Sequence, residues 1–566
     1  MKFSAAPFIL LLLCAAASRA ADPHAGLFAK DPYPSANQCK KCHEAIYKEW
    51  SSSNHAYAAI SPVFHKFEQR INDLSQGTVG TFCVRCHIPA GTALGETREQ
   101  PLWKRARVSR EGVTCVACHR VKEEYGRVNG ERRIEPGSIH EAVYGNSDGA
   151  ELLRVLSEKD GWRVKTAPEG PGMPIHAGSV RFETLSKSQF CVSCHQVAVH
   201  PGIKLEVVWE QYRASPAAKA GVSCQDCHMG KEPGKAAGYD LQPPAVVDGR
   251  PTAERAHHDH SFFGPGYPVA HPGIFPHSGS ETSIEDWLSF DWRAGWGTEE
   301  FEDKLEAGGP APAFPPAWAE RIDREEARST VERNLSLLNA KKASRAKVME
   351  NGSHLSGPFF FFPPKAGQPL RFHYKVENLN PGHNLPSGSL GAQPEIWLNV
   401  ALTDPDGTTV WESGYVDSRG DMADLHSLDV AAGKVPHDSQ LFNLQTKFLT
   451  TNVKGTDREM YLPINFDVDQ LPFIRPAGQP VTVLNHPPGI RMEGRSIPPL
   501  GSRKADYVVP KRLLKKPGRY RLSARLRSRA EPIYFMAFIG ATQETIQGMN
   551  EWMLDIHPYA VEFDVR

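Results

Sequence analysis

The sequence predicts two different halves: a mainly α-helical or irregular first half, followed by an all-β, sandwich-like second half. Five copies of a Cys-x-x-Cys-His motif lie between residues 39 and 228, among short segments with little long-range periodicity. After residue 351, apolar and polar residues alternate with a period of two, which is typical of strands with one buried face. We therefore expect a motif-bearing domain over residues 21–280, a helical and proline-rich connector over 281–350, and a β-sandwich over 351–566.

The five motifs indicate the chemistry of the first half. Two thiols can form thioethers to the vinyl groups of one haem, and the adjacent histidine is positioned to become an axial ligand of its iron. Zinc knuckles also use Cys-x-x-Cys pairs, but zinc does not require a histidine after every second cysteine. We therefore predict a pentahaem cytochrome c domain with five covalently bound haem c groups. The attaching cysteines are Cys39, Cys42, Cys83, Cys86, Cys115, Cys118, Cys191, Cys194, Cys224 and Cys227, and the motif histidines are His43, His87, His119, His195 and His228.

The amino-terminal segment has the pattern of a secretory signal peptide over residues 1–20. An apolar run at residues 8–13 precedes Ser18 and Ala20, small residues at the positions that signal peptidase recognises. We expect cleavage near Ala20 and a periplasmic or otherwise exported protein. A retained anchor is not expected, because the apolar run is too short to span a bilayer. No later segment offers a long uncharged stretch, so no transmembrane segment is expected in the mature chain. A lipid anchor on Cys14 is disfavoured because a leucine precedes it where a small residue is needed.

Cysteine use and charge exclude several other classes. Every cysteine except Cys14 belongs to a motif, so the mature chain keeps none for disulfides. Lys and Arg together number 65, as do Asp and Glu, so the formal net charge is +0. Bulk charge therefore gives no indication of nucleic acid or an acidic membrane surface as a partner.

Motifs two to five form two related pairs. Residues 82–87 and 190–195 share the pattern Phe-Cys-Val-x-Cys-His, and residues 112–119 and 221–228 share Gly-Val-Thr/Ser-Cys-x-x-Cys-His, at an offset of 108 to 109 residues. This spacing predicts a duplicated module that carries two haems, preceded by a leading fifth haem at His43.

Regular structure between the motifs is expected to be short. Residues 44–57 and 207–220 favour helices, and residues 120–133 favour a hairpin. The proline-rich stretch at 308–316 stops any helix, and a charged helix is expected from about 316 to 350.

The second half is expected to consist of strands joined by tight turns. Alternating apolar residues occur at 370–376, 396–402, 520–526 and 561–565, and turn sequences such as Asp404-Pro405-Asp406-Gly407 lie between them. This pattern predicts a cysteine-free β-sandwich. The run Phe359–Phe362 is expected to be a buried strand or a domain contact.

Function depends on the sixth ligand of each iron. A haem held only by its motif histidine keeps an open position where small molecules bind, whereas a second histidine closes that position and favours electron transfer. The candidate second ligands are His55, His140, His176, His200, and the cluster His257, His258 and His260. A surface or hydrogen-bonding role fits His24, His65, His271 and His277 at least as well.

One loop of the second half is also a candidate part of a haem site. The prolines and glycines of residues 380–388 make a rigid loop that could hold His383 against a haem edge or iron. The alternative is a tight strand connection in which this histidine only forms hydrogen bonds.

Residues 35–275 resemble periplasmic multihaem cytochromes c related to the tetrahaem electron acceptor of hydroxylamine oxidoreductase. The resemblance rests on Cys39–His43 with Trp50 and His55, on the two repeated motif pairs, and on His257–Phe262. It implies mostly bis-histidine, low-spin haems packed for electron tunnelling, sometimes with one five-coordinate haem. It also implies that His55 and the cluster around His260 supply distal ligands.

Two further comparisons with such proteins qualify the resemblance. Residues 382–388 look like a Gly-His-x-x-Pro-Thr-Gly signature of larger multihaem proteins with an appended β domain, with serine in place of threonine. The chain has five motifs rather than four, and it lacks the Cys-x-x-Cys-Lys motif of ammonia-forming nitrite reductases.

Three functions from different classes are compatible with these features. The leading prediction is an exported electron carrier that exchanges electrons with other cytochromes or a membrane quinol dehydrogenase. The alternative is an oxidoreductase in which one open-coordinate haem acts on a small nitrogen or sulfur compound. The third is a docking role for the β half, toward a partner protein or the cell surface.

Overall fold

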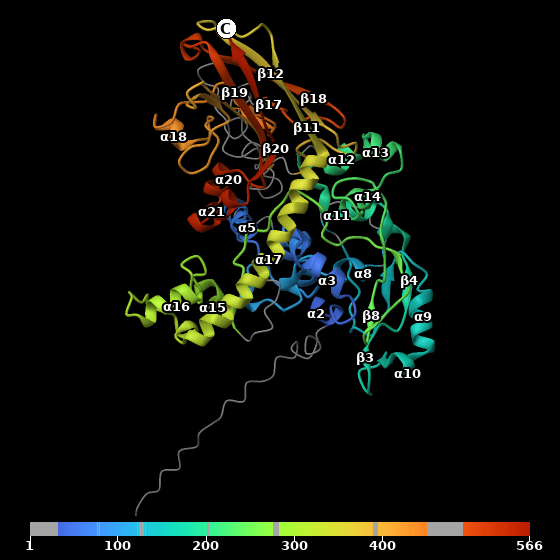
Figure 1. Ribbon diagram of the computed structural model, residues 1–566. Helices are drawn as coiled ribbons and strands as arrows, with labels where there is room; N and C mark the ends of the chain where they lie inside the picture. Colours follow the sequence, from blue (N-terminus) through green and yellow to red (C-terminus); the bar gives the residue numbers. More distant parts are fainter. Residues whose placement is uncertain are drawn as a thin grey trace, which may run out of the picture.

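The computed structural model describes residues 32–75, 77, 80–121, 123, 130, 132–200, 203–274, 282–388, 394–449 and 491–566. The expected signal peptide, His24 and His277 lie outside these residues. Figure 1 shows the large sheets of the second half at one end of the molecule and the short helices of the first half at the other, with the long helix α17 (Arg321–Gly352) running between them. No helix in the described part is long and apolar enough to cross a membrane.

The first half contains many short helices, and the motifs lie on or next to them. Four motif histidines end a helix of four to seven residues: α6 (Val84–His87), α8 (Val116–His119), α11 (Gln189–His195) and α14 (Cys224–His228). His43 instead lies between α2 (Ala36–Cys39) and α3 (Glu44–Ser51). Such short helices are stabilised by packing rather than by their own propensity.

Both helices expected between motifs are interrupted by a serine. The segment 44–57 forms α3 and α4 (Asn54–Tyr57), because the side chain of Ser53 caps the second helix at Ala56 N. The segment 207–220 forms α12 (Val208–Arg213) and α13 (Pro216–Lys219), where Ser215 is the cap. Serine competes with the helix for backbone hydrogen bonds, so a new helix begins at each of these positions. The hairpin expected at 120–133 falls largely outside the described residues, although a bridge joins Val121 to Ile134.

The two repeated modules share local geometry before their second motifs. Gly112 and Gly221 have positive φ values of 63° and 73°, which glycine adopts without strain. The carbonyl of the next residue accepts an aromatic donor in both cases: Trp50 Nε1 donates to Val113 O at 2.9 Å, and Tyr212 Oη donates to Val222 O at 2.8 Å. The two donors are not equivalent in sequence, because Trp50 precedes both modules and Tyr212 lies inside the second one, so the duplication stays a prediction.

Helix α17 connects the two halves. It begins at Arg321 after α15 (Ile284–Ser289), α16 (Glu299–Glu306) and a 3-10 turn at Pro316–Trp318, close to the expected start. Three of its buried side chains hold backbone carbonyls of the segment 261–272. Asn334 Nδ2 donates to Pro272 O at 2.7 Å, Lys341 Nζ to Ser261 O at 3.2 Å, and Arg345 Nε to Pro265 O at 2.8 Å. The helix thus fixes the loop that carries His260.

The second half contains two larger antiparallel sheets. One has the order β11 (Ser353–Phe360), β12 (Leu370–Asn378) and β18 (Ser502–Val509). The other has the order β14 (Thr409–Ser413), β13 (Glu395–Thr403), β19 (Gly518–Arg529) and β20 (Leu554–Val565), with β15 (Phe442–Asn443) also paired to β13. The register places Tyr374 opposite Ala505 and Leu398 opposite Leu526. The expected alternation is confirmed in β12, and both sheets contribute side chains to one hydrophobic core.

The expectation for the phenylalanine run is wrong for three of its four residues. Phe360 packs against Phe563 in the core, with ring centres 4.8 Å apart. Phe359, Phe361 and Phe362 are 45%, 55% and 72% exposed. Successive side chains of a strand point to opposite faces, so β11 turns Phe359 outward where Phe360 packs against the core. Phe361 and Phe362 lie beyond the end of this strand.

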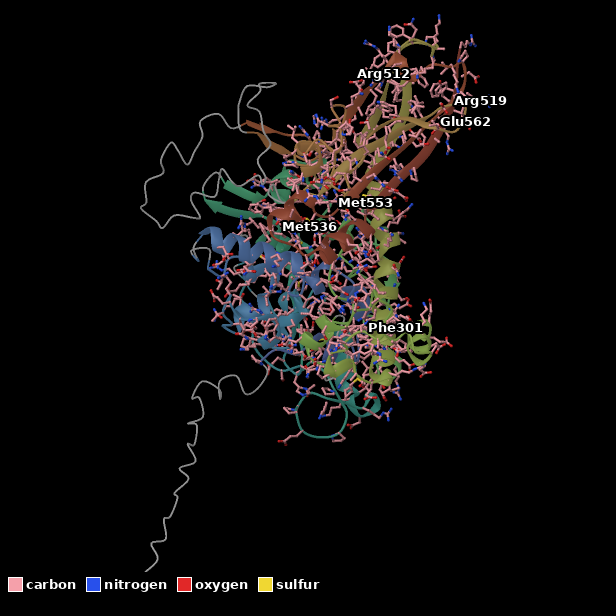
Figure 2. All side chains as sticks on the ribbon, turned by 90° about the vertical axis from the view of Figure 1, so that its left-hand side faces the viewer. Phe301, Arg512, Arg519, Met536, Met553 and Glu562 are labelled. Atoms are coloured by element: carbon pink, nitrogen blue, oxygen red, sulfur yellow. The ribbon has the colours of Figure 1, made fainter. Side chains whose placement is uncertain are left out.

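Two small helices of the second half pack against the first. α20 (Ile533–Phe538) lies beside α5 (Pro62–Ser75), where the rings of Phe535 and Phe67 are 5.3 Å apart, and α21 (Gln543–Glu551) follows it. Figure 2 shows Met536 near this junction, whereas Arg519 and Glu562 lie at the far end of the sheets.

Candidate haem-binding site

The motif histidines are held by hydrogen bonds at Nδ1. This nitrogen donates to a backbone carbonyl in three of them: His43 to Pro244 O at 2.6 Å, His119 to Tyr144 O at 2.8 Å and His228 to Phe263 O at 2.5 Å. A carbonyl can only accept, so Nδ1 carries the proton and Nε2 keeps its lone pair. Ligating histidines typically have this arrangement, which orients the ring and fixes its tautomer. None of the ten motif cysteines, all of which the structure describes, is in a disulfide, so all of them can serve for thioether bonds.

Four motif histidines face a second imidazole. The ring centres are 6.4 Å apart for His43 and His176, 6.0 Å for His195 and His55, 6.3 Å for His119 and His260, and 6.1 Å for His228 and His383. An iron between two imidazole nitrogens, each bound at about 2 Å, places the ring centres about 6 Å apart. Each gap therefore has the width that a six-coordinate haem iron needs.

The second histidines of these pairs are neutral and largely held in place. Burial lowers the pKa of His55 and His260 to about 3, and that of His176 and His383 to about 4. Neutral imidazole is the form that binds a metal. His176 Nδ1 donates to Ile139 O and His383 Nδ1 to Asn384 O, both at 2.9 Å. All four rings are therefore in the neutral form, and two of them, His176 and His383, are also oriented by a carbonyl acceptor as ligating histidines typically are.

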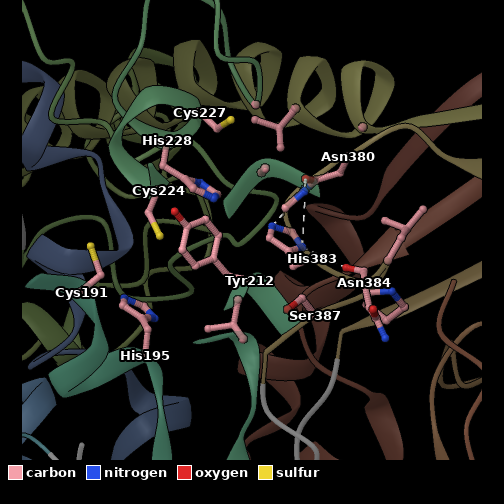
Figure 3. A pocket seen from close by; sticks show the side chains of 18 of the residues that line it. Cys191, His195, Tyr212, Cys224, Cys227, His228, Asn380, His383, Asn384 and Ser387 are labelled. Atoms are coloured by element: carbon pink, nitrogen blue, oxygen red, sulfur yellow. Dashed lines mark hydrogen bonds between the residues drawn. The ribbon is translucent and has the colours of Figure 1, made fainter. Parts of the chain in front are cut away.

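His383 reaches the fifth motif from the second half of the chain. Gln211 Oε1 on α12 accepts from Asn384 N at 3.2 Å and from Ser387 Oγ at 2.8 Å, so the loop 380–388 is fastened to the first half. Asn380 Nδ2 approaches His383 Nε2 at 3.0 Å, and this nitrogen accepts the hydrogen bond. Figure 3 shows His228 and His383 on opposite sides of a cavity that is also lined by Cys224 and Cys227. Both halves of the chain therefore build this pocket.

His87 has different surroundings. Its ring stacks on Phe64 of α5, with ring centres 4.0 Å apart and an interplanar angle of 11°. Burial lowers the pKa of His87 to about 4, so it too is neutral. Among the side chains that the structure describes, none is a second imidazole facing His87 at the spacing of the four pairs. His200 ends β5 (Val197–His200), and its side chain lies outside the described part.

His195 has a carboxylate behind its ring. Glu206 Oε1 on β6 (Ile203–Glu206) lies 3.5 Å from His195 Nδ1. Burial by itself lowers the pKa of His195, but the hydrogen bond and charge of Glu206 override it and raise the pKa to about 9. The negative charge of Glu206 also acts on His87. The β5–β6 hairpin is therefore close to both the second and the fourth motif.

The remaining candidate histidines have other contacts. Ile175 O lies 3.3 Å from His140 Nδ1, Glu49 Oε1 lies 2.6 Å from His257 Nε2, and His258 stacks on Tyr239 at 4.2 Å. His65 donates to Ala59 O and His271 to Phe290 O, in keeping with a hydrogen-bonding role. His176 and His383 occupy two of the four pairs, whereas His140, His257 and His258 occupy none of them. The glycine- and proline-rich loop was a signal for His383, whereas no local pattern distinguishes His176.

Three contacts between cysteines bring motifs together. The side chain of Cys39 lies close enough to raise the pKa of Cys115, that of Cys194 the pKa of Cys86, and that of Cys224 the pKa of Cys191. Because each sulfur marks an edge of its haem-binding site, the first motif adjoins the third, the second adjoins the fourth, and the fourth adjoins the fifth.

Comparisons with known proteins agree with this chemistry. The family model "Cytochrome c554 and c-prime" matches residues 38–120, which contain the first three motifs. A penta-heme cytochrome c552 from Thermochromatium tepidum matches with a TM-score of 0.46 and 15% identity, over 94% of this chain and 99% of that chain. An alkylpurine DNA glycosylase from Pseudomonas fluorescens bound to DNA matches with a TM-score of 0.13 and 8% identity, over 50% of this chain and 44% of that chain. At these TM-scores neither structural match carries an argument, and the search of curated proteins gave no match.

The motifs and the family match together define the class. Two thiols and a histidine recur in each motif, and the matched family consists of c-type cytochromes. Residues 38–120 therefore match a family of c-type cytochromes, and the five motifs are those of a chain that carries several haem c groups.

Proposed function

We propose that this protein is an exported electron carrier that holds five haem c groups and passes electrons between redox partners, such as other cytochromes or a membrane quinol dehydrogenase. The observation that supports this most strongly is the set of four histidine pairs with ring centres 6.0 to 6.4 Å apart. When bound, each haem supplies an iron that alternates between the ferric and ferrous states. Two imidazole ligands leave no iron position for a substrate, which suits transfer rather than catalysis.

The proposed ligands follow from the motifs and the pairs. We assign His43 with His176, His195 with His55, His119 with His260, and His228 with His383, and we assign two thioether bonds to each pair of motif cysteines. The proposed electron route follows the cysteine contacts, which link motif one with three, two with four, and four with five. Export is supported by the leader pattern of residues 1–20.

The chain's own hydrogen bonds tune these sites. Backbone carbonyls orient three motif histidines, whereas Glu206 presents a full negative charge to His195. A carboxylate partner makes the imidazole a stronger donor, which stabilises ferric iron and lowers its reduction potential. We therefore expect the iron at His195 to have a lower potential than its neighbours with carbonyl partners.

For the second half, we infer that the two sheets form a sandwich whose main role is to hold His383 at the fifth motif. The inference is supported by the single core that both sheets share and by the two hydrogen bonds to Gln211. This role differs from a detachable docking module, because removing the β half would also remove an iron ligand.

A His383→Ala variant tests both the ligand assignment and the role of the β half. We expect one iron to change from low spin to high spin in the electron paramagnetic resonance spectrum, and the reduced variant to bind carbon monoxide at that iron. His437→Ala, in the same half and outside the pairs, serves as the control and should leave all signals unchanged. An unchanged low-spin signal in His383→Ala would refute the assignment.

A second candidate function is favoured by the surroundings of His87. Phe64 stacks on the side of this ring, and none of the described side chains is a second imidazole at the spacing of the four pairs. This suits an open-coordinate haem that acts on a small nitrogen or sulfur compound. A carbon monoxide difference spectrum of the reduced wild-type protein tests this. Carbon monoxide binding at one haem of the wild type supports the oxidoreductase. Five low-spin haems in the wild type, with only four in His200→Ala, would support electron transfer alone.

A further inference from the structure

We propose that Arg132 is a positioning residue for electron transfer between the haems of the third and fourth motifs. This inference rests on the proposed electron-transfer function. The step moves one electron from a ferrous to a ferric iron, so one iron is oxidised, the other is reduced, and no bond forms or breaks. Cys118 of the third motif lies within electrostatic range of Cys191 and Cys194 of the fourth. Arg132 adds direct hydrogen bonds to both motifs and so links the pair of motifs one and three to the group of motifs two, four and five.

Arg132 contacts both motifs through opposite sides of its guanidinium group. Toward the third motif, Nη1 donates to Ala117 O at 3.2 Å and to Cys118 Sγ at 3.8 Å. Toward the fourth motif, Nε donates to Ser193 Oγ at 2.6 Å and Nη2 donates to Phe190 O. In the mature protein Cys118 Sγ is a thioether sulfur. One side chain therefore holds two haem-attachment loops at a fixed separation.

The shape of the guanidinium suits this role. Its Cζ atom lies 4.2 Å from the centre of the Phe190 ring, so its flat face stacks while its edges donate. A lysine ammonium could keep the charge but not the planar fork that reaches both loops. Arg132 thus provides geometry and charge together.

The charge of Arg132 is directed at the haem sites. The described partners of its nitrogens are carbonyl, hydroxyl and sulfur atoms rather than carboxylates. A positive charge near an iron favours the ferrous state, because reduction removes positive charge from the site. Arg132 should therefore raise the reduction potentials of the haems at the third and fourth motifs.

The backbone at Gly130 also contacts the fourth motif, which Arg132 joins to the third. Gly130 N donates to Ser193 O at 2.5 Å, and a Cβ atom on Gly130 would lie 2.7 Å from Cys86 Sγ. Residues 130 and 132 therefore lie against the second and fourth motifs as well as the third, where several electron paths meet.

The test compares Arg132→Gln and Arg132→Lys with Arg133→Gln, whose arginine is 74% exposed. In Arg132→Gln we expect the ratio of reduced to oxidised iron at a fixed potential to fall about tenfold for two haems, which corresponds to about 59 mV for one electron. In Arg132→Lys we expect the ratio of reduced to oxidised iron to change by less than about threefold, because the charge is kept. Electron exchange between the haems after pulse reduction should nevertheless become at least about threefold slower, because the two loops are no longer held together. Arg133→Gln should match the wild type.

The outcomes separate this inference from the proposed function. Unchanged potentials in Arg132→Gln, or an unchanged exchange rate in Arg132→Lys, would overturn the role of Arg132 even if the wild type shows its low-spin haems. If Arg132→Gln does not accumulate with haem, the exchange rate of Arg132→Lys still decides. If the wild type itself lacks bis-histidine low-spin signals, the proposed function fails regardless of the variants.

Discussion

His87 and His195 occupy equivalent positions in the two repeated modules, yet their surroundings differ. His195 faces His55 at 6.0 Å and has Glu206 behind it, whereas His87 stacks on Phe64 at 4.0 Å. The residues around the two motifs are nearly the same in sequence, Phe-Cys-Val-x-Cys-His in both. The difference teaches that a motif specifies attachment and one axial ligand, while the segments packed against it decide what the iron can do.

The largest effect should come from making His195 resemble His87. We expect His55→Phe to convert one low-spin iron to high spin and to create a carbon monoxide site, because the proposed sixth ligand is lost. Electron paramagnetic resonance and a carbon monoxide difference spectrum measure both changes. His271→Phe is the control, since His271 donates to Phe290 O and accepts from Gly273 N and is not one of the four pairs. A His55→Phe protein with wild-type spectra would contradict the equivalence of the four pairs.

The next largest effect should come from removing the Phe64 ring that stacks on His87. Phe64 is 8% exposed and packs with Ala59, Val84 and Ile88, so Phe64→Ala should lower the free energy of unfolding by about 3 kcal/mol. Spectral changes should be confined to one haem. Thermal unfolding followed by haem absorbance provides the measurement. Phe361→Ala, at a ring 55% exposed, should change stability by less than about 0.5 kcal/mol. Equal losses in the two variants would show that the stack does not matter.

A smaller effect is expected at the loop that completes the second module. Gln211→Ala removes the acceptor of Asn384 N and Ser387 Oγ, which should cost about 1 to 2 kcal/mol and loosen His383. We expect a fraction of the fifth haem to become high spin on warming, and variable-temperature absorbance can detect it. Gln547→Ala, whose amide bonds only the exposed Glu551 in the described part, is the matched control. A fully low-spin fifth haem at all temperatures below unfolding would show that Gln211 does not hold the loop.

The smallest effect should come from the carboxylate behind His195. Glu206→Gln removes the negative charge, so the ratio of reduced to oxidised iron at that haem should rise about tenfold, or about 59 mV for one electron. A potentiometric titration measures this shift. Glu183→Gln, at an exposed residue paired with Arg181, should leave every potential unchanged. A fall in potential in Glu206→Gln would contradict the proposed role of the charge.

Much of the fold could be predicted because its signals are local. The period-two alternation predicted strands such as β12, and the charged segment after the prolines predicted α17 within about five residues at its start. The local patterns gave wrong predictions where single residues decide the structure. Ser53 and Ser215 begin new helices, and Phe361 is exposed just beyond the end of β11.

The residues of the candidate haem sites also fall into those that local patterns predict and those that they do not. The five motif histidines follow from the motifs alone, and His55 and His260 were candidates because of their place beside a motif. The pairing of His55 with His195 rather than His43, and the arrival of His176 and His383, depend on long-range packing that no local pattern contains. The ligand assignments remain predictions until spectra test them.

Quantitative electron paramagnetic resonance of the oxidised wild-type protein tests the central claim most directly. The four histidine pairs predict low-spin ferric signals that integrate to at least four irons per chain. A fifth, high-spin signal would belong to the haem at His87. Fewer than four low-spin irons in a protein that carries all its haems would contradict the account.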